Sequence, residues 1–383
     1  MNLLVLDQFS DPGGAQQVLM ELLPAMRERG WRALVGVPGQ GEVLARAKAL
    51  GFDTAHVECG PYRAGRKSAM DALRFLVSTP LLAWQLRRLA ARAKADLVYV
   101  NGPRLLPAVA MARLRQPVVF HSHSYLPPGK VRDIAGESLA RAGAWVVASC
   151  RFVGDPWREY VRDRVQVIYN GIAGPSGEAW VPNEPGGPRI GCIGRIAREK
   201  GQLEFLRAAG AILREIPDAR FLILGASLFG ATRGSRYESD VRAAAAGLPV
   251  EFAGWIRDVY QALARLDLLL VPSAANEATT RVIPEAFAAG VPVVAFASGG
   301  IPEVVVDGRT GVLVGSASEM ARAAVELSRD RERAAELAAA GRESWRERFQ
   351  AERFQRELLD FLVERVREHH RAKDAAARTK DTA

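Results

Sequence analysis

The chain has 383 residues, of which 49% are hydrophobic and 25% charged, and its formal net charge is +9. This balance is that of a globular protein, so it excludes disordered, collagen-like and low-complexity chains. Three widely spaced cysteines, Cys59, Cys150 and Cys192, predict neither a disulfide framework nor a cysteine-based zinc site, and they indicate a reducing cytosol.

Short apolar runs alternate with helical patterns along the whole chain. In the first half we expect helices at 15–29 and 43–50, and strands at 3–6, 33–37, 97–100, 118–120, 145–148 and 165–168. In the second half we expect helices at 202–215, 241–246 and 284–289, and strands at 190–193, 221–224, 268–271 and 293–296. This alternation is typical of βαβ units, so the fold class is α/β with parallel sheets.

Proline and glycine are dense in residues 181–188, and this density predicts a linker. We therefore expect two Rossmann-like domains facing each other, one at 1–183 and one at 184–350. A ligand would bind at the carboxyl ends of the strands. A helical pattern at 351–371 is expected to pack back toward the N-terminal domain, and 372–383 is expected to form a flexible tail.

The first residues lack the basic start and the cleavage site of a signal peptide. No uncharged apolar run approaches the ~20 residues that a bilayer crossing needs. A cytoplasmic protein is therefore expected.

A glycine turn with two cations follows the predicted strand 190–193. Gly194 is followed at once by Arg195, and Lys200 comes five residues later as a helix begins. Glycine lets a backbone approach a phosphate closely, and the two cations would neutralise it. A surface turn with two solvated cations fits the same residues, so both interpretations stay open.

Two glutamates follow the predicted strand 268–271. Glu277 falls in the loop after the strand, and Glu285 falls in the first turn of the next helix. The free N–H groups of a helix start can bind a phosphate, and carboxylates beside it can accept hydrogen bonds from sugar hydroxyls. Alternatively, Glu285 only complements the helix dipole.

Two shorter motifs lie in the first half. Gly13 and Gly14 connect the first strand to the first helix, which fits either a plain tight turn or a close approach to an anion. They are not part of a dinucleotide-binding G-x-G-x-x-G fingerprint. His121 and His123 end a strand and point to the same side of it. A metal pair is conceivable, but a structural role is the default for at least one of them.

Positive charge is concentrated in residues 62–94, where eight basic residues and one acid account for +7 of the net +9. A helix at 69–93, bent near Pro80, would carry Trp84 and an arginine cluster beside apolar stripes. Such a helix suits an anionic membrane surface, although one packed on its own sheet with solvated arginines has the same pattern. Because aromatic residues are sparse there, we do not expect nucleic-acid binding.

Together these motifs resemble the retaining glycosyltransferases of family 4, over Leu3 to about Phe349. The most specific stretch is 250–314, with Glu251-Phe252-Ala253-Gly254-Trp255, Leu268 to Ser273, Glu277 to Glu285, Gly299-Gly300-Ile301-Pro302-Glu303, Asp307-Gly308 and Thr310-Gly311. Tyr169-Asn170-Gly171-Ile172 is similar to the family's crossing between domains. The resemblance implies the GT-B fold, with two Rossmann-like domains facing across a cleft.

The resemblance also implies the reaction and the residues that perform it. A hexosyl or related sugar would pass from a nucleoside diphosphate, UDP or GDP, to an acceptor hydroxyl with retention and without a metal or other cofactor. The implied catalytic residues are His123, rather than His121, with Glu277, Arg195 and Lys200. The implied donor-binding residues are Gly13, Gly14, Gly194, Arg195, Lys200, Glu277, Thr280, Arg281 and Glu285. The acceptor would be a glycan, a lipid-linked sugar or a small molecule, in cell-surface glycan, polysaccharide or glycolipid synthesis.

One departure from the family pattern concerns the donor sugar. Between the two glutamates the family usually has a Phe-Gly pair, whereas this chain has Thr279 and Thr280. The Cβ of Thr280 restricts the backbone, so the sugar preference differs or activity is altered. This departure leaves a catalytically silent partner subunit as one alternative function, and a non-hydrolysing epimerase of the same fold is another.

Overall fold

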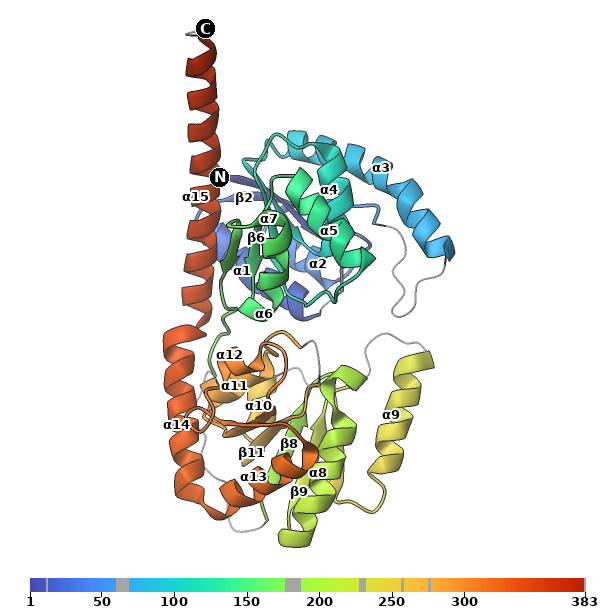
Figure 1. Ribbon diagram of the computed structural model, residues 1–383, viewed down its shortest axis with the longest axis vertical. Helices are drawn as coiled ribbons and strands as arrows, with labels where there is room; N and C mark the ends of the chain where they lie inside the picture. Colours follow the sequence, from blue (N-terminus) through green and yellow to red (C-terminus); the bar gives the residue numbers. More distant parts are fainter. Residues whose placement is uncertain are drawn as a thin grey trace. The chain divides into compact units, whose positions relative to one another are not determined.

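The computed structural model describes residues 1–11, 13–59, 69–175, 187–226, 232–255, 258–274 and 277–381. Its contacts divide the chain into two compact units, Met1–Asn170 with Phe354–Ala383, and Gly171–Arg353 (Figure 1). The boundary falls earlier than the expected 183/184. One reason is that Ile172 already belongs to the second unit, where its N–H donates to the carbonyl of Phe349 (2.8 Å) and its carbonyl accepts from Ala351 (3.1 Å). Residues 176–186 of the expected linker lie outside the described residues.

The first unit is built on a seven-stranded parallel sheet in the order β3-β2-β1-β4-β5-β6-β7. The strands are β1 (Asn2–Asp7), β2 (Arg32–Val37), β3 (Asp53–His56), β4 (Leu97–Asn101), β5 (Val118–Ser122), β6 (Trp145–Ala148) and β7 (Val165–Val167). The order reverses between β1 and β4. In sheets of this kind, ligands bind at the carboxyl ends of the strands on either side of the reversal.

Helices cover both faces of this sheet, because alternate residues of β1 point to opposite sides. Leu3 and Val5 belong to one core, with α1 (Gly14–Glu28), α2 (Glu42–Ala49) and α15 (Ala351–Asp381). Leu4 and Leu6 belong to the other core, with α3 (Ala69–Arg92), α4 (Leu106–Ala112) and α5 (Lys130–Arg141). The short helices α6 (Arg151–Gly154) and α7 (Arg158–Val161) precede β7.

The second unit is built on a six-stranded parallel sheet in the order β10-β9-β8-β11-β12-β13. The strands are β8 (Arg189–Ile193), β9 (Arg220–Leu224), β10 (Val250–Gly254), β11 (Leu268–Val271), β12 (Val293–Phe296) and β13 (Val312–Val314). This order reverses between β8 and β11, so the loops after these two strands are the place to look for a ligand.

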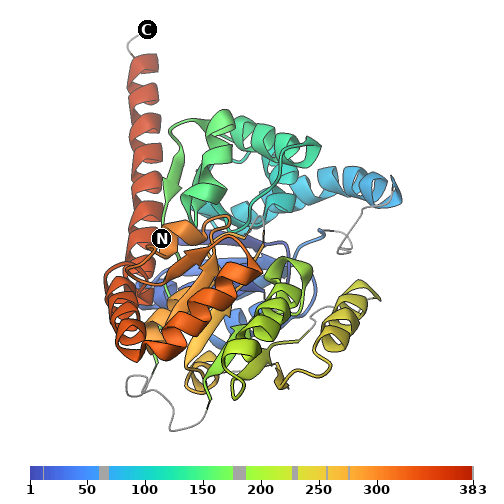
Figure 2. The same cartoon turned by 60° about the horizontal axis from the view of Figure 1, so that its bottom comes forward.

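The helices of the second unit are α8 (Gln202–Glu215), α9 (Thr232–Ala244), α10 (Val259–Leu263), α11 (Val282–Ala289), α12 (Ile301–Val304), α13 (Ala317–Arg329) and α14 (Arg331–Arg348). Phe205 of α8 and Met320 of α13 share one buried core with Ile190 of β8. Figure 2 shows α8 and α13 side by side over this sheet. The Rossmann-like architecture expected for both halves is thus present in each unit.

Two of the expected helical segments differ from the structure. The helix expected at 241–246 is the end of α9, which begins at Thr232. The residues expected to form a tail from 372 continue α15 to Asp381. Alanine, arginine and lysine dominate that segment and have high helix propensities, so the chain continues in the helical conformation after its apolar stripe ends.

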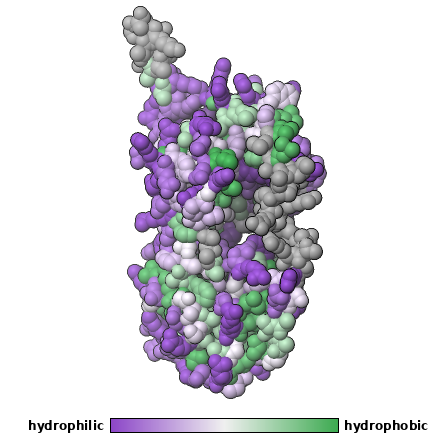
Figure 3. All heavy atoms as spheres, turned by 45° about the vertical axis from the view of Figure 1, so that its right-hand side comes forward, coloured by the Kyte–Doolittle hydropathy of each residue, from purple (hydrophilic) through white to green (hydrophobic). Residues whose placement is uncertain are grey.

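Exposed apolar side chains gather on one side of the first unit. On α3, Leu73, Val77, Leu81 and Trp84 are all exposed, and exposed residues on the neighbouring helices are Met111 of α4 and Val131 and Ile134 of α5. Figure 3 shows hydrophobic surface of this kind beside the grey residues in the upper part of the view. Within the described ranges, none of the helices combines the length and apolar character needed to cross a membrane.

Candidate active site

Three loops of the second unit are joined backbone to backbone at the switch point of its sheet. Gly201, with a φ of +71°, lies so close to the β11 loop that a Cβ would sit 2.0 Å from the carbonyl oxygen of Pro272. Gly299, with a φ of +57°, lies equally close to Glu277, where a Cβ would sit 1.9 Å from the carbonyl oxygen. Only glycine fits both the backbone angle and the space at these positions. The described residues of the loops after β8, β11 and β12 therefore pack directly against one another.

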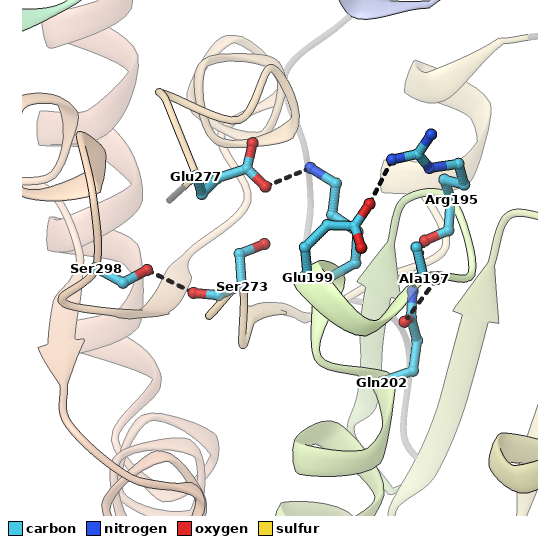
Figure 4. Close-up of polar contacts among 8 residues, drawn as sticks. Arg195, Ala197, Glu199, Gln202, Ser273, Glu277 and Ser298 are labelled. Carbon is cyan, nitrogen blue, oxygen red and sulfur yellow. Dashed lines mark hydrogen bonds and ion pairs between the residues drawn. The ribbon is translucent and has the colours of Figure 1, made fainter. Parts of the chain in front are cut away.

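This packing brings Lys200 and Glu277 together across 77 residues of sequence. The Nζ of Lys200 donates to Oε2 of Glu277 at 2.7 Å, with 22% and 15% of the two side chains exposed (Figure 4). The Ala274 N–H donates to the Glu199 carbonyl (3.1 Å), and the Gly300 N–H donates to the Glu277 carbonyl (3.1 Å). Both members of the ion pair thus sit on backbone segments that are themselves fixed.

Arg195 belongs to the same loop group but is more exposed. Its guanidinium donates to Glu199 at 2.5 Å, and 36% of its side chain is exposed. Its backbone is held by Gln202, which is 1% exposed. The amide of Gln202 donates to the Arg195 carbonyl (2.9 Å) and accepts from the Ala197 N–H (3.3 Å) (Figure 4). Gln202 was not a candidate from the sequence, because a glutamine at a helix start is usually solvated.

The start of α11 carries a second ion pair. Arg281 is the N-cap residue and Glu285 lies in the first turn, with 3.6 Å between the Arg281 Nε and the Glu285 Oε1. The side chains are 24% and 14% exposed. The N–H of Glu285 donates to the Arg281 carbonyl (3.1 Å), and the N–H of Ile283 donates to the Thr280 carbonyl (3.2 Å). Thr280 therefore ends the loop that begins at Glu277 and leads into the helix.

In the first unit, Gly13 and Gly14 occupy the start of α1. Gly13 is the N-cap residue, and its carbonyl accepts from the N–H of Gln17 (2.9 Å). A Cβ on Gly13 would lie 2.9 Å from the Gln16 Oε1, whereas a Cβ on Gly14 would meet none of the described atoms within 4 Å. The packing of the described residues therefore does not explain why residue 14 is glycine.

The two histidines after β5 have different surroundings. The Nδ1 of His121 shares a 2.5 Å hydrogen bond with the Tyr99 hydroxyl, and burial together with the neighbouring His123 lowers the pKa of His121 well below its usual value. His121 is thus a neutral, structural side chain. His123 is only half-buried, and its Nε2 lies 2.7 Å from the Asn101 Oδ1. Among the described residues, no group of three or more His, Cys, Asp or Glu side chains is placed to hold a metal ion.

Asp7 and Asn101, at the ends of β1 and β4, complete the polar cluster of the first unit. The Asn101 amide Nδ2 donates to the Asp7 Oδ2, and Gln16 Nε2 donates to Oδ1 at 2.8 Å. Asp7 is fully buried, and this burial raises the pKa of its carboxyl to about 6. The hydrogen bonds that it accepts lower the pKa, but their effect is smaller than that of burial. Neither Asp7 nor Asn101 was a candidate from the sequence, since each reads as the last residue of an apolar strand.

Two family models match the chain, glycosyltransferase family 4 at residues 12–173 and glycosyl transferases group 1 at residues 187–330. The α-maltose-1-phosphate synthase of Mycolicibacterium smegmatis is 30% identical over 278 residues, covering 61% of this chain and 69% of that protein. A GDP-mannose-dependent α-(1-6)-phosphatidylinositol monomannoside mannosyltransferase of Mycobacterium tuberculosis is 33% identical over 191 residues, covering 46% of this chain and 47% of that protein.

The fold also matches solved structures. Anabaena HepE in complex with UDP and glucose superposes with a TM-score of 0.78 at 24% identity, over 95% of this chain and 99% of that one. The class of protein that the two sheets define is therefore the GT-B fold. The chain belongs to glycosyltransferase family 4, and it is a glycosyltransferase.

Proposed function

We propose that the protein is a retaining glycosyltransferase that moves a sugar from a nucleoside diphosphate to an acceptor hydroxyl without a metal ion. The observation that carries this proposal is the Lys200–Glu277 pair at the carboxyl ends of β8 and β11. It sets a cation suited to a diphosphate beside a carboxylate suited to sugar hydroxyls. The GDP-mannose-dependent relative and the HepE complex with UDP support such a donor, whose base is UDP or GDP in this proposal.

In this proposal, the loop after β8 holds the diphosphate. Lys200 and Arg195 contact its oxygens, and Gly194, with a φ of +152°, lets the backbone come close. Thr280 and Arg281 contact it from the start of α11, where backbone N–H groups and the helix dipole favour an anion. Glu285 accepts hydrogen bonds from the ribose hydroxyls.

Glu277 accepts hydrogen bonds from the transferred sugar, and His123 with Gly13 and Gly14 contributes from the first unit. The bond from the sugar C1 to the diphosphate oxygen breaks, and the acceptor oxygen bonds to C1 from the same face. The hydroxyl proton of the acceptor passes to the departing diphosphate. In this proposal, Lys200 and Arg195 contact the leaving diphosphate and stabilise its developing charge, an effect commonly worth several kcal/mol.

The first experiment is a thermal-shift screen against UDP-, GDP- and ADP-sugars, since a ligand that binds the native state raises the melting temperature. Turnover of the stabilising donor is then measured for Lys200→Ala and Arg195→Ala. Arg214→Ala, which removes an exposed cation from α8, is the matched control. We expect both site variants to lose turnover by ~100-fold or more while the control keeps it. Near-normal turnover in both site variants would refute the phosphate assignment.

The same assay separates the two alternative functions. Interconversion of the donor sugar without transfer to an acceptor would identify an epimerase. Binding of the donor without turnover by the unmodified chain would identify a silent partner subunit. Thr279 and Thr280, which replace the family's Phe-Gly pair, are the reason to consider this alternative. Anomeric configuration of the product, read by NMR coupling constants, decides whether transfer is retaining.

We also propose that α3 docks on an anionic membrane that carries the acceptor, which would make the enzyme a cytoplasmic, peripheral membrane protein. Trp84 lines a shallow groove with Pro80, Ala83, Ala91 and Met111, and Arg87 and Arg88 border it. The Arg88 guanidinium lies 4.7 Å from the centre of the Trp84 ring. Further exposed arginines on this helix are Arg74 and Arg92, whereas the side chains of 62–72 lie outside the described set. Apolar residues flanked by arginine match a surface of acidic lipid headgroups.

Co-sedimentation with vesicles tests this surface. We expect binding to phosphatidylcholine vesicles that contain phosphatidylglycerol at low salt, and much weaker binding to phosphatidylcholine alone. Trp84→Ser should weaken the binding, whereas Trp255→Ser is a matched control because Trp255, in the second unit, is 55% exposed and Trp84 is 54% exposed. Equal binding by both variants would refute the assignment of the membrane surface to α3, and no binding to anionic vesicles would refute the membrane proposal.

A further inference from the structure

A buried hydrogen-bonded chain crosses three neighbouring strands of the first unit at their carboxyl ends. It runs from Asp7, the last residue of β1, through Asn101, the last residue of β4, to His123, which follows β5. Asp7 and Asn101 are 0% and 1% exposed, whereas His123 is half-buried. The chain therefore connects a fully buried carboxylate to a histidine that has partial access to solvent.

The chemistry of the three groups sets the direction of each hydrogen bond. An ionised carboxylate can only accept, so Asn101 turns its Nδ2 toward Asp7. The carbonyl oxygen of Ala15, at the start of α1, accepts from the same Nδ2 at 3.3 Å, which favours the same amide orientation. The Oδ1 of Asn101 therefore faces His123, and it can only accept. It follows that the Nε2 of His123 carries the hydrogen and donates.

We propose that Asp7 and Asn101 are positioning residues that hold His123 as the neutral tautomer protonated on Nε2, and that they do so only while Asp7 is ionised. This inference rests on the proposed function, because it assigns His123 to the reaction. A hydrogen bond at Nε2 fixes the ring plane and makes Nδ1 the acceptor of the ring. Because Nδ1 itself is buried, Asp7 and Asn101 act on a substrate through the orientation of the half-buried ring.

Protonation of Asp7 reverses the arrangement. The carboxylic acid becomes a donor, so the Asn101 amide can turn its Oδ1 toward Asp7 and its Nδ2 toward His123. The Nε2 of His123 then has to accept, and the ring has to move its hydrogen to Nδ1. Because burial raises the pKa of Asp7 to about 6, this change falls between neutral and mildly acidic pH.

The other titratable groups around Asp7 come from several elements. Burial raises the pKa of Tyr99 on β4 and of Cys59 after β3, and burial lowers the pKa of His121 on β5, so all three are neutral near pH 7. Arg104 of the 3-10 helix after β4 (Pro103–Leu105) and Glu58 interact electrostatically with Cys59, and His123 belongs to the same hydrogen-bonded chain as Asp7. Among the described residues, Asp7 therefore titrates beside neutral Tyr99 and Cys59, with Arg104, Glu58 and His123 as the further titratable groups.

The direct test is the tautomer of His123, read from nitrogen-15 correlation spectra of the full chain. We expect the Nε2–H form at pH 7.5, and a shift toward the Nδ1–H form in Asp7→Asn at the same pH. Ser149→Ala, which removes a fully buried hydroxyl at the end of the neighbouring strand β6, is the matched control and should keep the Nε2–H form. Far-ultraviolet circular dichroism of Asp7→Asn establishes that the variant is folded.

Turnover provides the second readout. Asp7→Asn should lower kcat by ~10-fold or more with little change in the donor KM, and it should remove the acid limb of the pH profile. An Nε2–H tautomer that persists in Asp7→Asn at pH 7.5 would overturn the inference. The His123→Ala variant separates the two proposals. If this variant turns over normally, and the tautomer of His123 in the otherwise unmodified chain still depends on Asp7, Asp7 and Asn101 do position His123 but His123 has no role in the proposed reaction.

Discussion

The buried carboxylate of Asp7 predicts an unusual dependence of stability on pH. Its pKa in the folded protein is about 6, against an ordinary value of 3.8. Between these two values the folded state binds more protons than the unfolded state. The contribution of Asp7 to the free energy of unfolding is therefore complete below pH 3.8, and it is lost as the pH rises through 6.

The size of this effect follows from the shift itself. A difference of about 2 pKa units, at 1.36 kcal/mol per unit, corresponds to about 3 kcal/mol. No discount for solvent screening is needed, because the side chain is fully buried. For a unit of this size, such a change moves the melting temperature by roughly 6–12 °C.

The assay compares urea unfolding of the unmodified chain and of Asp7→Asn from pH 7.5 to pH 4.5. Other titrating groups contribute equally to both proteins, so the difference between the two free energies isolates Asp7. We expect the unmodified chain to gain most of the 3 kcal/mol relative to the variant as the pH falls. A difference that stays flat, or that changes in the opposite sense, would refute the burial argument. Turnover should fall over the same pH range in which the free energy of unfolding rises. If Asp7 had only a structural role, its protonation would raise stability without lowering turnover.

Three further predictions concern the geometry of the two clusters. Gly201→Ala should destabilise the protein by ~2 kcal/mol or more, measured by urea unfolding, because its φ of +71° and the carbonyl of Pro272 leave no place for a Cβ. Gly14→Ala should leave the melting temperature unchanged or slightly raised, since its Cβ would meet open space, yet it should weaken donor-induced stabilisation if a ligand approaches there. Gln202→Ala should cost ~1–3 kcal/mol in the same unfolding assay, because the part-buried carbonyl of Arg195 and N–H of Ala197 lose this partner, and Gln202→Glu should not restore the stability, since its carboxylate would face the Arg195 carbonyl oxygen.

The sequence predicts the strands at the centre of each sheet well, but of the four edge strands it predicts β7 and misses β3, β10 and β13. The expected strands 268–271 and 293–296 coincide with β11 and β12, because both are buried, continuous apolar runs. The edge strand β3 (Asp53–His56) is polar and partly exposed, so it has no apolar run to detect. Similarly, β13 spans three residues and only Val314 is buried.

The residues of the candidate site were also only partly predicted from the sequence, for a different reason. Lys200, Glu277 and Glu285 were candidates because their residue types follow predicted strands or begin predicted helices. Asp7 and Asn101 were not, although they are hydrogen-bonded to each other, because 94 residues separate them. Their relation depends on β1 and β4 being neighbours in the sheet, and the order of the strands cannot be read from one sequence. A strand-final polar residue becomes informative only once the neighbouring strand is known.

The pairing of cations with carboxylates in the second unit has a consequence for selectivity. Lys200 is bound to Glu277, so a diphosphate has to compete with that carboxylate for the cation. A nucleoside diphosphate without a sugar would leave Glu277, which is 15% exposed, without its charged partner. A sugar nucleotide supplies hydroxyl donors to Glu277 while its phosphates take Lys200. Recognition of the phosphate and recognition of the sugar are therefore coupled through one ion pair.

Substitution of Glu277 separates these two contributions. Glu277→Gln removes the competing charge and keeps the size of the side chain, so we expect the free nucleoside diphosphate to bind several-fold tighter than it binds the unmodified chain. The gain in affinity from an attached sugar should shrink in the same variant, because a neutral amide accepts weaker hydrogen bonds from hydroxyls than a carboxylate does. Isothermal titration of both ligands to both proteins measures the four affinities. If the variant weakens both ligands by the same factor, Glu277 acts on the loop structure and the proposed coupling is wrong.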